Sequence, residues 1–223
     1  MLSIVSTPLG NLGDITLRAV ETLKNCDAII CEDTRVTGSL LQHLALPKKE
    51  LISCHGYSST EKVEAILRRL QNNEHLAMVS DAGTPGISDP GYALVSRARN
   101  AGIAIEVIPG PSAFLAALSL SGLPINQFLY MGFPPLKKGR QTLFKSFTEE
   151  ERTIVLYESV HRIEKTLNEI ADALANQPDR NIVIARELTK MHEEVVATTV
   201  AELKNTAAAI TKKGEFVVVI GAL

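Results

Sequence analysis

Short apolar runs rich in β-branched residues alternate along this chain with longer segments in which apolar residues recur at helical spacing. Strands that helices cover on both faces are apolar almost throughout, and several of the runs have this character. The runs predict strands at Leu2–Ser6, Ala28–Cys31, His75–Ser80, Ile103–Ile108, Phe128–Met131, Thr153–Tyr157, Ile182–Arg186, Val195–Val200 and Phe216–Ile220.

The segments between these runs predict helices. Apolar residues recur every three or four positions over residues 63–70 and again over 163–174, which is the spacing of one helix face packed on a core. Ser58 and Glu61 have the spacing of a capping box at the start of the first helix. Such stripes indicate packing and carry no information about function.

The pattern of elements changes near Gly122-Leu123-Pro124. Before this point, strands and helices alternate with Gly-rich turns, which predicts a parallel sheet. After it, the runs Val195–Val200 and Phe216–Ile220 predict a mixed sheet. We therefore expect an α/β fold of two domains, an N-terminal α/β domain over residues 1–122 and a C-terminal α/β domain over residues 123–223.

Glycine and proline concentrate directly after three of the predicted strands, in Thr7–Asp14, Asp81–Gly91 and Pro109–Ala113. Glycine lets a ligand approach bare backbone, and proline stiffens the loop that carries it. Because ligands of open α/β sheets bind outside the carboxyl ends of the strands, these loops predict one shared binding crevice. A set of tight turns with no ligand is the alternative.

Polar clusters follow other predicted strands. Glu32–Arg35 comes after the second strand, and Ala185–Glu194 comes after the seventh in chain order. Tyr157–Arg162 follows a strand and precedes a helix, with Ser159 as its expected N-cap. Titratable groups at strand ends suit either catalysis or surface ion pairs, and both interpretations stay open.

Composition narrows the classes of partner. A formal net charge of −2 gives no global basic field that would attract nucleic acid. Contact with RNA would depend on a local patch, and the best one is Leu136–Arg140, which includes Lys137 and Lys138. A solvated loop explains this segment equally well.

Nothing in the chain predicts a metal site, a disulfide framework or a membrane span. The three cysteines cannot all pair internally, and Val196 stands where a zinc motif beginning at His192 would need a second histidine. No apolar run approaches the roughly 20 residues of a membrane span. The chain enters its first strand at once, so we expect no signal peptide and a cytoplasmic location.

The common nucleotide-binding signatures are also missing. The chain has no G-x-G-x-x-G fingerprint and no P-loop, which argues against an NAD-dependent oxidoreductase and against phosphate cradling. Any adenosine-containing ligand would be held in another way. A nucleotide-binding module without chemistry stays open as an alternative.

Taken in order along nearly the whole chain, these segments resemble the tetrapyrrole methylase family, most closely its RNA-modifying branch. The segments that carry the resemblance are Thr7–Thr16, Glu32–Arg35, Ser80–Gly91, Pro109–Ala113, Tyr157–Arg162 and Ala185–Glu194. The resemblance implies two α/β domains with S-adenosylmethionine in the cleft between them, and a homodimer. It also implies methylation of the ribose 2′-hydroxyl of a cytidine in the decoding region of 16S rRNA, within the small ribosomal subunit.

The family's cofactor contacts can be transferred to matching positions of this chain. They are Pro8, Leu9, Asp81, Gly83, Thr84, Ile87, Ser112, Ala113, Tyr157, Ala185 and Phe216. Many tetrapyrrole-modifying relatives carry Gly-Asp-Pro where this chain has Gly83-Thr84-Pro85, so a contact through that acidic side chain is not expected here.

A ribose hydroxyl is a poor nucleophile at neutral pH, so a nearby base would assist methyl transfer. Asp33 and Glu158 are the candidate bases. The basic residues available to RNA are Arg35, Lys137, Lys138, Arg140 and Arg162.

A tetrapyrrole C-methyltransferase on the same fold is the main alternative, and the polar clusters favour the RNA branch over it. RNA-modifying members usually continue beyond the last strand into a small C-terminal domain, whereas this sequence ends at Leu223. If that domain helps to hold RNA, we expect this chain to bind the cofactor and to methylate RNA poorly.

Overall fold

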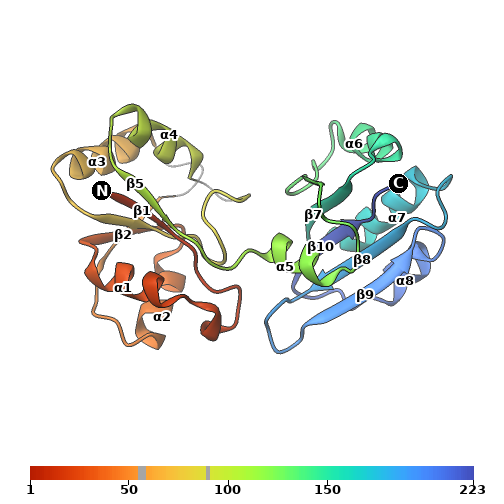
Figure 1. Ribbon diagram of the computed structural model, residues 1–223, viewed down its shortest axis with the longest axis horizontal. Coiled ribbons are helices and arrows are strands. Elements are labelled where there is room, and N and C mark those ends of the chain that lie inside the picture. Colours follow the sequence, from red (N-terminus) through yellow and green to blue (C-terminus); the bar gives the residue numbers. More distant parts are fainter. Residues whose placement is uncertain (55–58, 89–90) are drawn as a thin grey trace. The chain divides into compact units, whose positions relative to one another are not determined.

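The computed structural model describes residues 1–54, 59–88 and 91–223. Its backbone forms two compact units, Met1–Ser112 and Ala113–Leu223, each of which is described by itself (Figure 1). The division therefore falls before helix α5 (Ala113–Leu120), earlier than the expected boundary at 122/123. The reason is that α5 packs against β10 and β7 of the second unit.

The first unit is a parallel sheet of five strands in the order β3-β2-β4-β1-β5. Its strands are β1 (Leu2–Val5), β2 (Ala28–Cys31), β3 (Glu50–Ser53), β4 (Leu76–Met78) and β5 (Ile105–Ile108). Its helices are η1 (Leu12–Asp14), α1 (Leu17–Asn25), α2 (Thr34–His43), α3 (Thr60–Gln71) and α4 (Tyr92–Asn100).

Helices cover both faces of this sheet, α3 and α4 on one side and α1 and α2 on the other (Figure 1). Side chains alternate between the two faces along each strand. Leu2, Ile30 and Leu76 join one buried apolar cluster with α3 and α4, whereas Val5 and Ile29 join a second cluster with α1 and α2. Burial on both faces explains why these strands are apolar throughout.

The chain changes direction across the sheet between β1 and β4, which are hydrogen-bonded neighbours. After β1 the chain passes over one face through α1, and after β4 it passes over the other face through α4 (Figure 1). This is the topological switch point of an open α/β sheet, where the loops at the carboxyl ends leave room for a ligand.

The second unit is a mixed sheet, as the sequence predicted, and its five strands have the order β6-β7-β10-β8-β9. Its strands are β6 (Phe128–Tyr130), β7 (Thr153–Ser159), β8 (Asn181–Arg186), β9 (Glu194–Thr199) and β10 (Glu215–Ile220). Besides α5, its helices are α6 (Arg140–Ser146), η2 (Phe147–Glu149), α7 (Ile163–Ala173) and α8 (Leu203–Ala209). Strands β6 and β7 pair in parallel, and the other neighbouring strands pair antiparallel.

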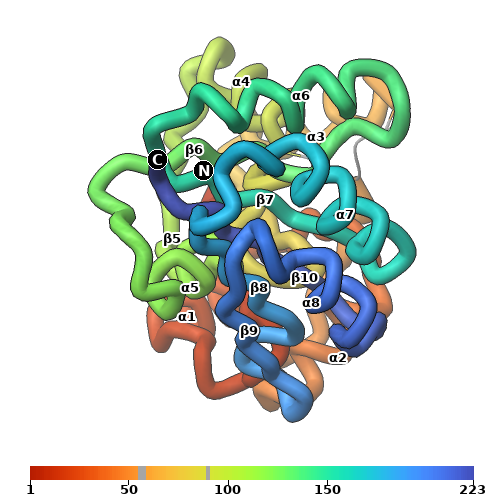
Figure 2. The backbone as a smooth tube through the Cα atoms, turned by 90° about the vertical axis from the view of Figure 1, so that its right-hand side faces the viewer, coloured from red at the N-terminus to blue at the C-terminus, as the bar shows by residue number. Residues whose placement is uncertain are grey.

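One face of the second sheet packs on α6, α7 and α8 through the largest buried cluster of this unit, which includes Leu156, Ile184 and Phe216. Helices α7 and α8 lie side by side over this face (Figure 2). Because α5 contacts β10 and β7 but contributes nothing to this cluster, it lies on the opposite face.

All the predicted strands are present, with ends that differ by one or two residues. The expected N-cap Ser159 is wrong, because β7 continues through Ser159 to pair with Glu215, and α7 begins only after Arg162. The predicted capping residue Ser58 lies outside the described residues, and α3 begins after Ser59.

Three further expectations concern the cysteines, a metal site and membrane-spanning helices. Cys26 and Cys31 are buried free thiols, and Cys54 is a half-buried free thiol. Over the described ranges, no cluster of His, Cys, Asp and Glu side chains is arranged to hold a metal ion. No helix in the same ranges is long and apolar enough to cross a membrane.

Candidate functional site

Thr7 and Gly83 join the loops that follow β1 and β4. The Thr7 N–H donates to the Gly83 carbonyl over 2.9 Å, and the Gly83 N–H donates back to the Thr7 carbonyl over 3.1 Å. The Thr7 hydroxyl also donates to the Ser80 carbonyl over 3.0 Å. These bonds fix the two loops to each other at the switch point of the sheet.

Thr84 ties in the loop that follows β5. Its hydroxyl donates to the Pro111 carbonyl over 3.0 Å, and Ser6 Oγ lies 2.9 Å from Thr84 Oγ1. Since the Thr84 hydrogen is used on Pro111, the Ser6 hydroxyl is the donor in the second bond. A Cβ on Gly110 would lie 2.8 Å from Ser6 Cβ, so only glycine permits this approach. The three predicted loops therefore lie together.

Bare backbone faces the solvent side of this junction. Gly83 has a φ of +82°, and a Cβ there would lie 3.2 Å from Leu9 Cδ2. Gly86 has a φ of +84° with open space around the position of a Cβ. Both residues adopt the left-handed conformation that glycine reaches without strain. At the exposed Gly86, the loop after β4 thus presents backbone that no side chain covers, whereas Gly83 is buried with its N–H and carbonyl bonded to Thr7.

Asp33 connects a fourth loop, the one after β2, to the same group. Its N–H donates to Asp81 Oδ1 over 3.2 Å. The Asp33 carboxylate caps α2 by accepting from the Arg35 N–H over 2.8 Å, and it pairs with Arg35 Nη2 at 2.5 Å. The hydrogen bonds from the Arg35 side chain lower the pKa of Asp33 to about 2. A carboxylate with that pKa is a weak base at neutral pH, so this geometry argues against Asp33 as the proton acceptor.

Ser112 carries a buried hydroxyl for which the described part of the chain supplies no hydrogen-bond partner. Asp14 Oδ2, in the loop after β1, is also buried and has no hydrogen-bond partner among the described residues. Buried polar atoms without partners are rare, because each costs desolvation free energy with no bond in return. The Ser112 hydroxyl is the kind of group that a ligand satisfies.

The remaining predicted cofactor contacts of the first unit differ in exposure. Pro8 is buried, Leu9 and Ile87 are half-buried, and Asp81 is exposed. Together with Ser112 and the bare glycines, they offer apolar surface, one carboxylate, one hydroxyl and backbone groups. This set of donors and acceptors fits S-adenosylmethionine, which presents an adenine, a ribose diol and a charged amino-acid end. The set includes no cationic side chain that would hold a phosphate.

In the second unit, Tyr157, Val217 and Ala185 lie in register across β7, β10 and β8. Tyr157 Oη accepts from the Phe114 N–H at the start of α5 over 3.2 Å, so this row lies on the face that α5 covers. Ala113 is the residue before Phe114 and is half-buried. The side chains of Tyr157 and Ala185 therefore share one face of the sheet.

Phe216 lies on the other face of the same sheet. Its side chain is 1% exposed and belongs to the core under α6, α7 and α8. Adjacent residues of a strand point to opposite faces, so Val217 and not Phe216 shares the face of Tyr157. The Phe216 side chain is thus a core residue, and only its backbone is available to a ligand on the Tyr157 face.

Glu158 is buried with every carboxylate oxygen engaged. Its Oε1 accepts from Arg162 Nη2 over 2.8 Å and from the Ser159 N–H over 2.7 Å. Its Oε2 accepts from the Thr166 hydroxyl over 2.6 Å and lies 3.8 Å from Arg140 Nη1. A side chain with no exposed surface and these partners holds structure together, and this corrects the expectation that Glu158 acts as a base.

Arg140 and Arg162, expected to contact RNA, belong to the same buried network. Arg140 is 3% exposed, donates to Glu169 Oε2 over 2.6 Å and to Thr166 Oγ1 over 2.5 Å, and lies over the Phe144 ring. Arg162 pairs with Glu158 and donates to the Pro134 carbonyl. The Arg140 guanidinium is buried away from solvent, and the half-buried Arg162 is engaged by Glu158 and the Pro134 carbonyl. Arg35, in contrast, is exposed and paired with Asp33.

Lys137 and Lys138 are exposed on the loop between β6 and α6. They satisfy the first requirement for a contact with RNA phosphates, and they are the part of the predicted basic patch that solvent reaches.

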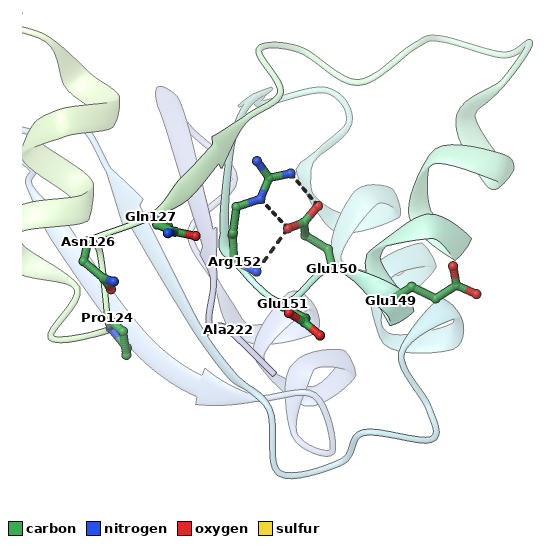
Figure 3. A pocket seen from close by; sticks show the side chains of 8 residues that line it. All are labelled: Pro124, Asn126, Gln127, Glu149, Glu150, Glu151, Arg152 and Ala222. Atoms are coloured by element: carbon green, nitrogen blue, oxygen red, sulfur yellow. Dashed lines mark hydrogen bonds and ion pairs between the residues drawn. The ribbon is translucent and has the colours of Figure 1, made fainter.

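A cavity of about 470 Å³ lies elsewhere in the second unit (Figure 3). It is lined by Pro124, Asn126, Gln127, Glu149, Glu150, Glu151, Arg152 and Ala222. Glu150 and Arg152 pair with each other at its wall (Figure 3). None of the predicted site residues lines it, and its glutamates would repel phosphate.

Several residues that organise these groups were not identified from the sequence. Ser6, Gly110 and Thr166 make the contacts that hold the loops and the buried network. Ser6 ends a predicted strand and Gly110 lies in a Pro-Gly-Pro turn, so the sequence indicated that both lie near the binding loops. Thr166 lies within an ordinary helical pattern, and nothing in the sequence indicated its role.

These features define a class of protein. It is an α/β chain with a parallel unit, whose Gly- and Pro-rich loops meet at the switch point, followed by a unit with a mixed sheet. A profile of the family described as Tetrapyrrole (Corrin/Porphyrin) Methylases matches residues 1–204, and the chain belongs to this family.

The chain is also similar to proteins named ribosomal RNA small subunit methyltransferase I. It is 47% identical over 203 residues to the protein of that name from Escherichia coli O157:H7, a match that covers 91% of this chain and 70% of that protein. It is 44% identical over 201 residues to the protein of that name from Thermotoga maritima, covering 90% of this chain and 89% of that protein.

Solved structures share the fold at low sequence identity. A cobalt precorrin-4 methyltransferase of cobalamin biosynthesis superposes with a TM-score of 0.73 at 19% identity, covering 99% of this chain and 94% of that one. Diphthine synthase superposes with a TM-score of 0.74 at 17% identity, covering 99% and 89%. These structural similarities confirm the fold class, and they do not identify the substrate.

Proposed function

We propose that this chain transfers a methyl group from S-adenosylmethionine to the RNA of the small ribosomal subunit. The relatives named for that activity match about nine tenths of this chain at 44 to 47% identity. The observation in the structure that carries the proposal is the junction of loops after β1, β2, β4 and β5, with a buried hydroxyl that has no partner within the described ranges.

The proposed acceptor is the ribose 2′-hydroxyl of a cytidine in the decoding region of 16S rRNA. The proposed enzyme acts as a homodimer in the cytoplasm. The acceptor follows from the resemblance of the polar segments to the RNA-modifying branch of the family. Light scattering of the purified chain tests the dimer independently of its activity.

S-adenosylmethionine, when bound, supplies a methyl group activated by a sulfonium sulfur. In the first unit, Asp81 would accept from ligand hydroxyls or face a ligand cation, and Ser112 would bond a ligand polar atom. Leu9 and Ile87 would pack on apolar ligand surface, and Gly86 would offer its backbone. Gly83, whose N–H and carbonyl bond Thr7, would keep the loop close to the ligand. In the second unit, Ala113, Tyr157 and Ala185 would contribute from the α5 face, and Phe216 through its backbone.

Alignment of the reacting atoms supplies most of the rate in this account. Displacement at a methyl carbon needs the nucleophile, the carbon and the leaving group in line, and rigid loops provide such alignment. Neither Asp33, with its lowered pKa, nor the buried Glu158 is placed to take the hydroxyl proton. The joined loops therefore matter more to catalysis than any single base.

Methyl transfer tests the proposal directly. The purified chain is incubated with methyl-labelled S-adenosylmethionine and small ribosomal subunits that lack ribose methylation, and the rRNA is digested to nucleosides. We expect label in 2′-O-methylcytidine. A parallel incubation with a porphyrinogen tests the tetrapyrrole alternative, and label only in that arm would overturn the proposal.

A further inference from the structure

Residues 132–139, which connect β6 to α6, form a loop whose backbone is held from within, and we call it the Phe133 loop. The Tyr157 N–H donates to the Gly132 carbonyl over 2.9 Å. Arg162 Nη1 donates to the Pro134 carbonyl over 3.0 Å, and Arg140 Nη1 donates to the Pro135 carbonyl over 3.1 Å. A loop pinned at successive carbonyls keeps one shape without support from its own side chains.

Two guanidinium groups carry most of this support, that of Arg140 buried and that of Arg162 half-buried. Each is neutralised beneath the loop, Arg162 by Glu158 and Arg140 by Glu169. Burying such charges costs desolvation free energy, which the hydrogen bonds offset. The result of this arrangement is a fixed loop, because both arginines direct one nitrogen to a loop carbonyl.

Most side chains of the loop are exposed, and Pro134 is buried. Phe133 is 52% exposed and Leu136 is 73% exposed, and both lysines are exposed. The loop carries two exposed lysines and no acidic residue. In a chain whose net charge is −2, this is a local site of positive charge next to an exposed aromatic ring.

Phe133 is the exposed end of a row of aromatic rings. Its centroid lies 5.5 Å from that of Tyr157, and Tyr157 in turn contacts Tyr130 edge-on at 5.7 Å. Tyr130 stacks on Phe114 at 4.5 Å. The row holds the Phe133 ring from one side and leaves the rest of it to solvent.

We propose that the Phe133 loop binds single-stranded RNA, with Phe133 stacking on an unpaired base and Lys137 and Lys138 contacting neighbouring phosphates. Bases of unpaired RNA stack on exposed aromatic side chains, and lysines beside such a ring neutralise the backbone. This inference rests on the proposed function and names the contacts that hold its substrate. Arg140, Glu158 and Arg162 are positioning residues, since they act on RNA only through the loop.

The test uses the full chain and a short single-stranded RNA that carries 2-aminopurine, whose fluorescence falls when it stacks on a ring. Phe133→Leu keeps apolar bulk against Tyr157 and removes the ring, whereas Phe133→Tyr keeps the ring. We expect Phe133→Leu to weaken binding about tenfold and to abolish the quenching, and Phe133→Tyr to preserve both. Equal affinity and quenching in wild type and Phe133→Leu would overturn the stacking role.

The lysines are tested by salt dependence. Replacing Lys137 and Lys138 by alanine is expected to reduce the slope of log K against log salt by about 0.7 for each phosphate that a lysine neutralises in wild type. Lys24→Ala, at an exposed position on α1, is the matched control and leaves the slope unchanged. An unchanged slope in the double variant would refute the phosphate contacts.

The outcome can be separated from the fate of the proposed function. If wild type methylates small subunits while Phe133→Leu does so with unchanged KM and unchanged RNA affinity, the loop inference fails and the function stands. If wild type binds and quenches the RNA through Phe133 and transfers no methyl group, the loop inference stands and the function fails.

Discussion

Thr84 Oγ1 donates to the carbonyl of Pro111 over 3.0 Å, and this bond joins the loops that follow β4 and β5. Relatives that modify tetrapyrroles often carry an aspartate at the position of Thr84. In this chain the side chain binds protein groups on both sides, Pro111 and Ser6. Thr84 therefore shapes the site, and its side chain is not free for the cofactor contact that the sequence suggested.

Thr84→Val is expected to lower the free energy of unfolding by about 1–3 kcal/mol, because it leaves a partly buried carbonyl and the Ser6 hydroxyl without their partner. We also expect weaker binding of S-adenosylhomocysteine, since the loops after β4 and β5 are no longer held together. Thr84→Ser keeps the hydroxyl and is the control. Urea denaturation and calorimetry measure both effects, and equal behaviour of the valine and serine variants would contradict this role.

Ser112→Ala is expected to weaken cofactor binding without lowering the stability of the fold. The Ser112 hydroxyl has no partner in the described residues, so its removal costs the folded chain no hydrogen bond. If the hydroxyl bonds the cofactor, the variant keeps its Tm and loses roughly 2- to 12-fold in affinity, consistent with a net value of about 0.5–1.5 kcal/mol for one hydrogen bond. Unchanged affinity with unchanged Tm would remove Ser112 from the site.

Glu158→Gln distinguishes a structural carboxylate from a catalytic one. Removing the charge leaves the half-buried Arg162 without its ion-pair partner, whereas Arg140 keeps Glu169, and the lost charged hydrogen bond should lower the unfolding free energy by about 1.5–3 kcal/mol. Methyl transfer per folded molecule should stay within a few-fold of wild type. Glu151→Gln, at an exposed position, is the control. A fully stable variant with a rate loss of about 100-fold or more would identify Glu158 as a base.

The pKa of Asp33 depends on Arg35. The Arg35 hydrogen bonds hold it at about 2, below the usual 3.8, so their stabilisation is present above pH 3.8 and is lost as the pH falls towards 2. In Arg35→Ala the pKa of Asp33 should return towards its usual value. Carboxyl ¹³C titration by NMR measures this shift, and a pKa near 2 in the variant would show that another group sets it.

Much of the fold followed from the sequence because burial on both faces makes strands apolar. Strand β3 (Glu50–Ser53) was missed because it lies at the sheet edge, where Glu50 is exposed and the remaining residues are only half-buried. The convergence of the loops was also predictable, since parallel strands end at one edge of the sheet.

The site residues were harder to predict, because residue type does not reveal burial. Glu158 and Arg140 have the composition of a catalytic or RNA-binding cluster, yet inside the second unit Glu158 pairs with Arg162 and Arg140 pairs with Glu169. The face occupied by Phe216 depends on the pairing of β10 with β7 and β8, which the apolar pattern of a strand buried on both sides does not specify.

Calorimetric titration with S-adenosylhomocysteine tests most directly whether the joined loops hold the cofactor. We predict one site per chain in wild type, clearly weaker binding in Asp81→Ala, and unchanged binding in Asp172→Ala, which removes an exposed carboxylate of α7 in the second unit. No binding by the folded wild-type chain, or equal affinity in wild type and Asp81→Ala, would contradict the account.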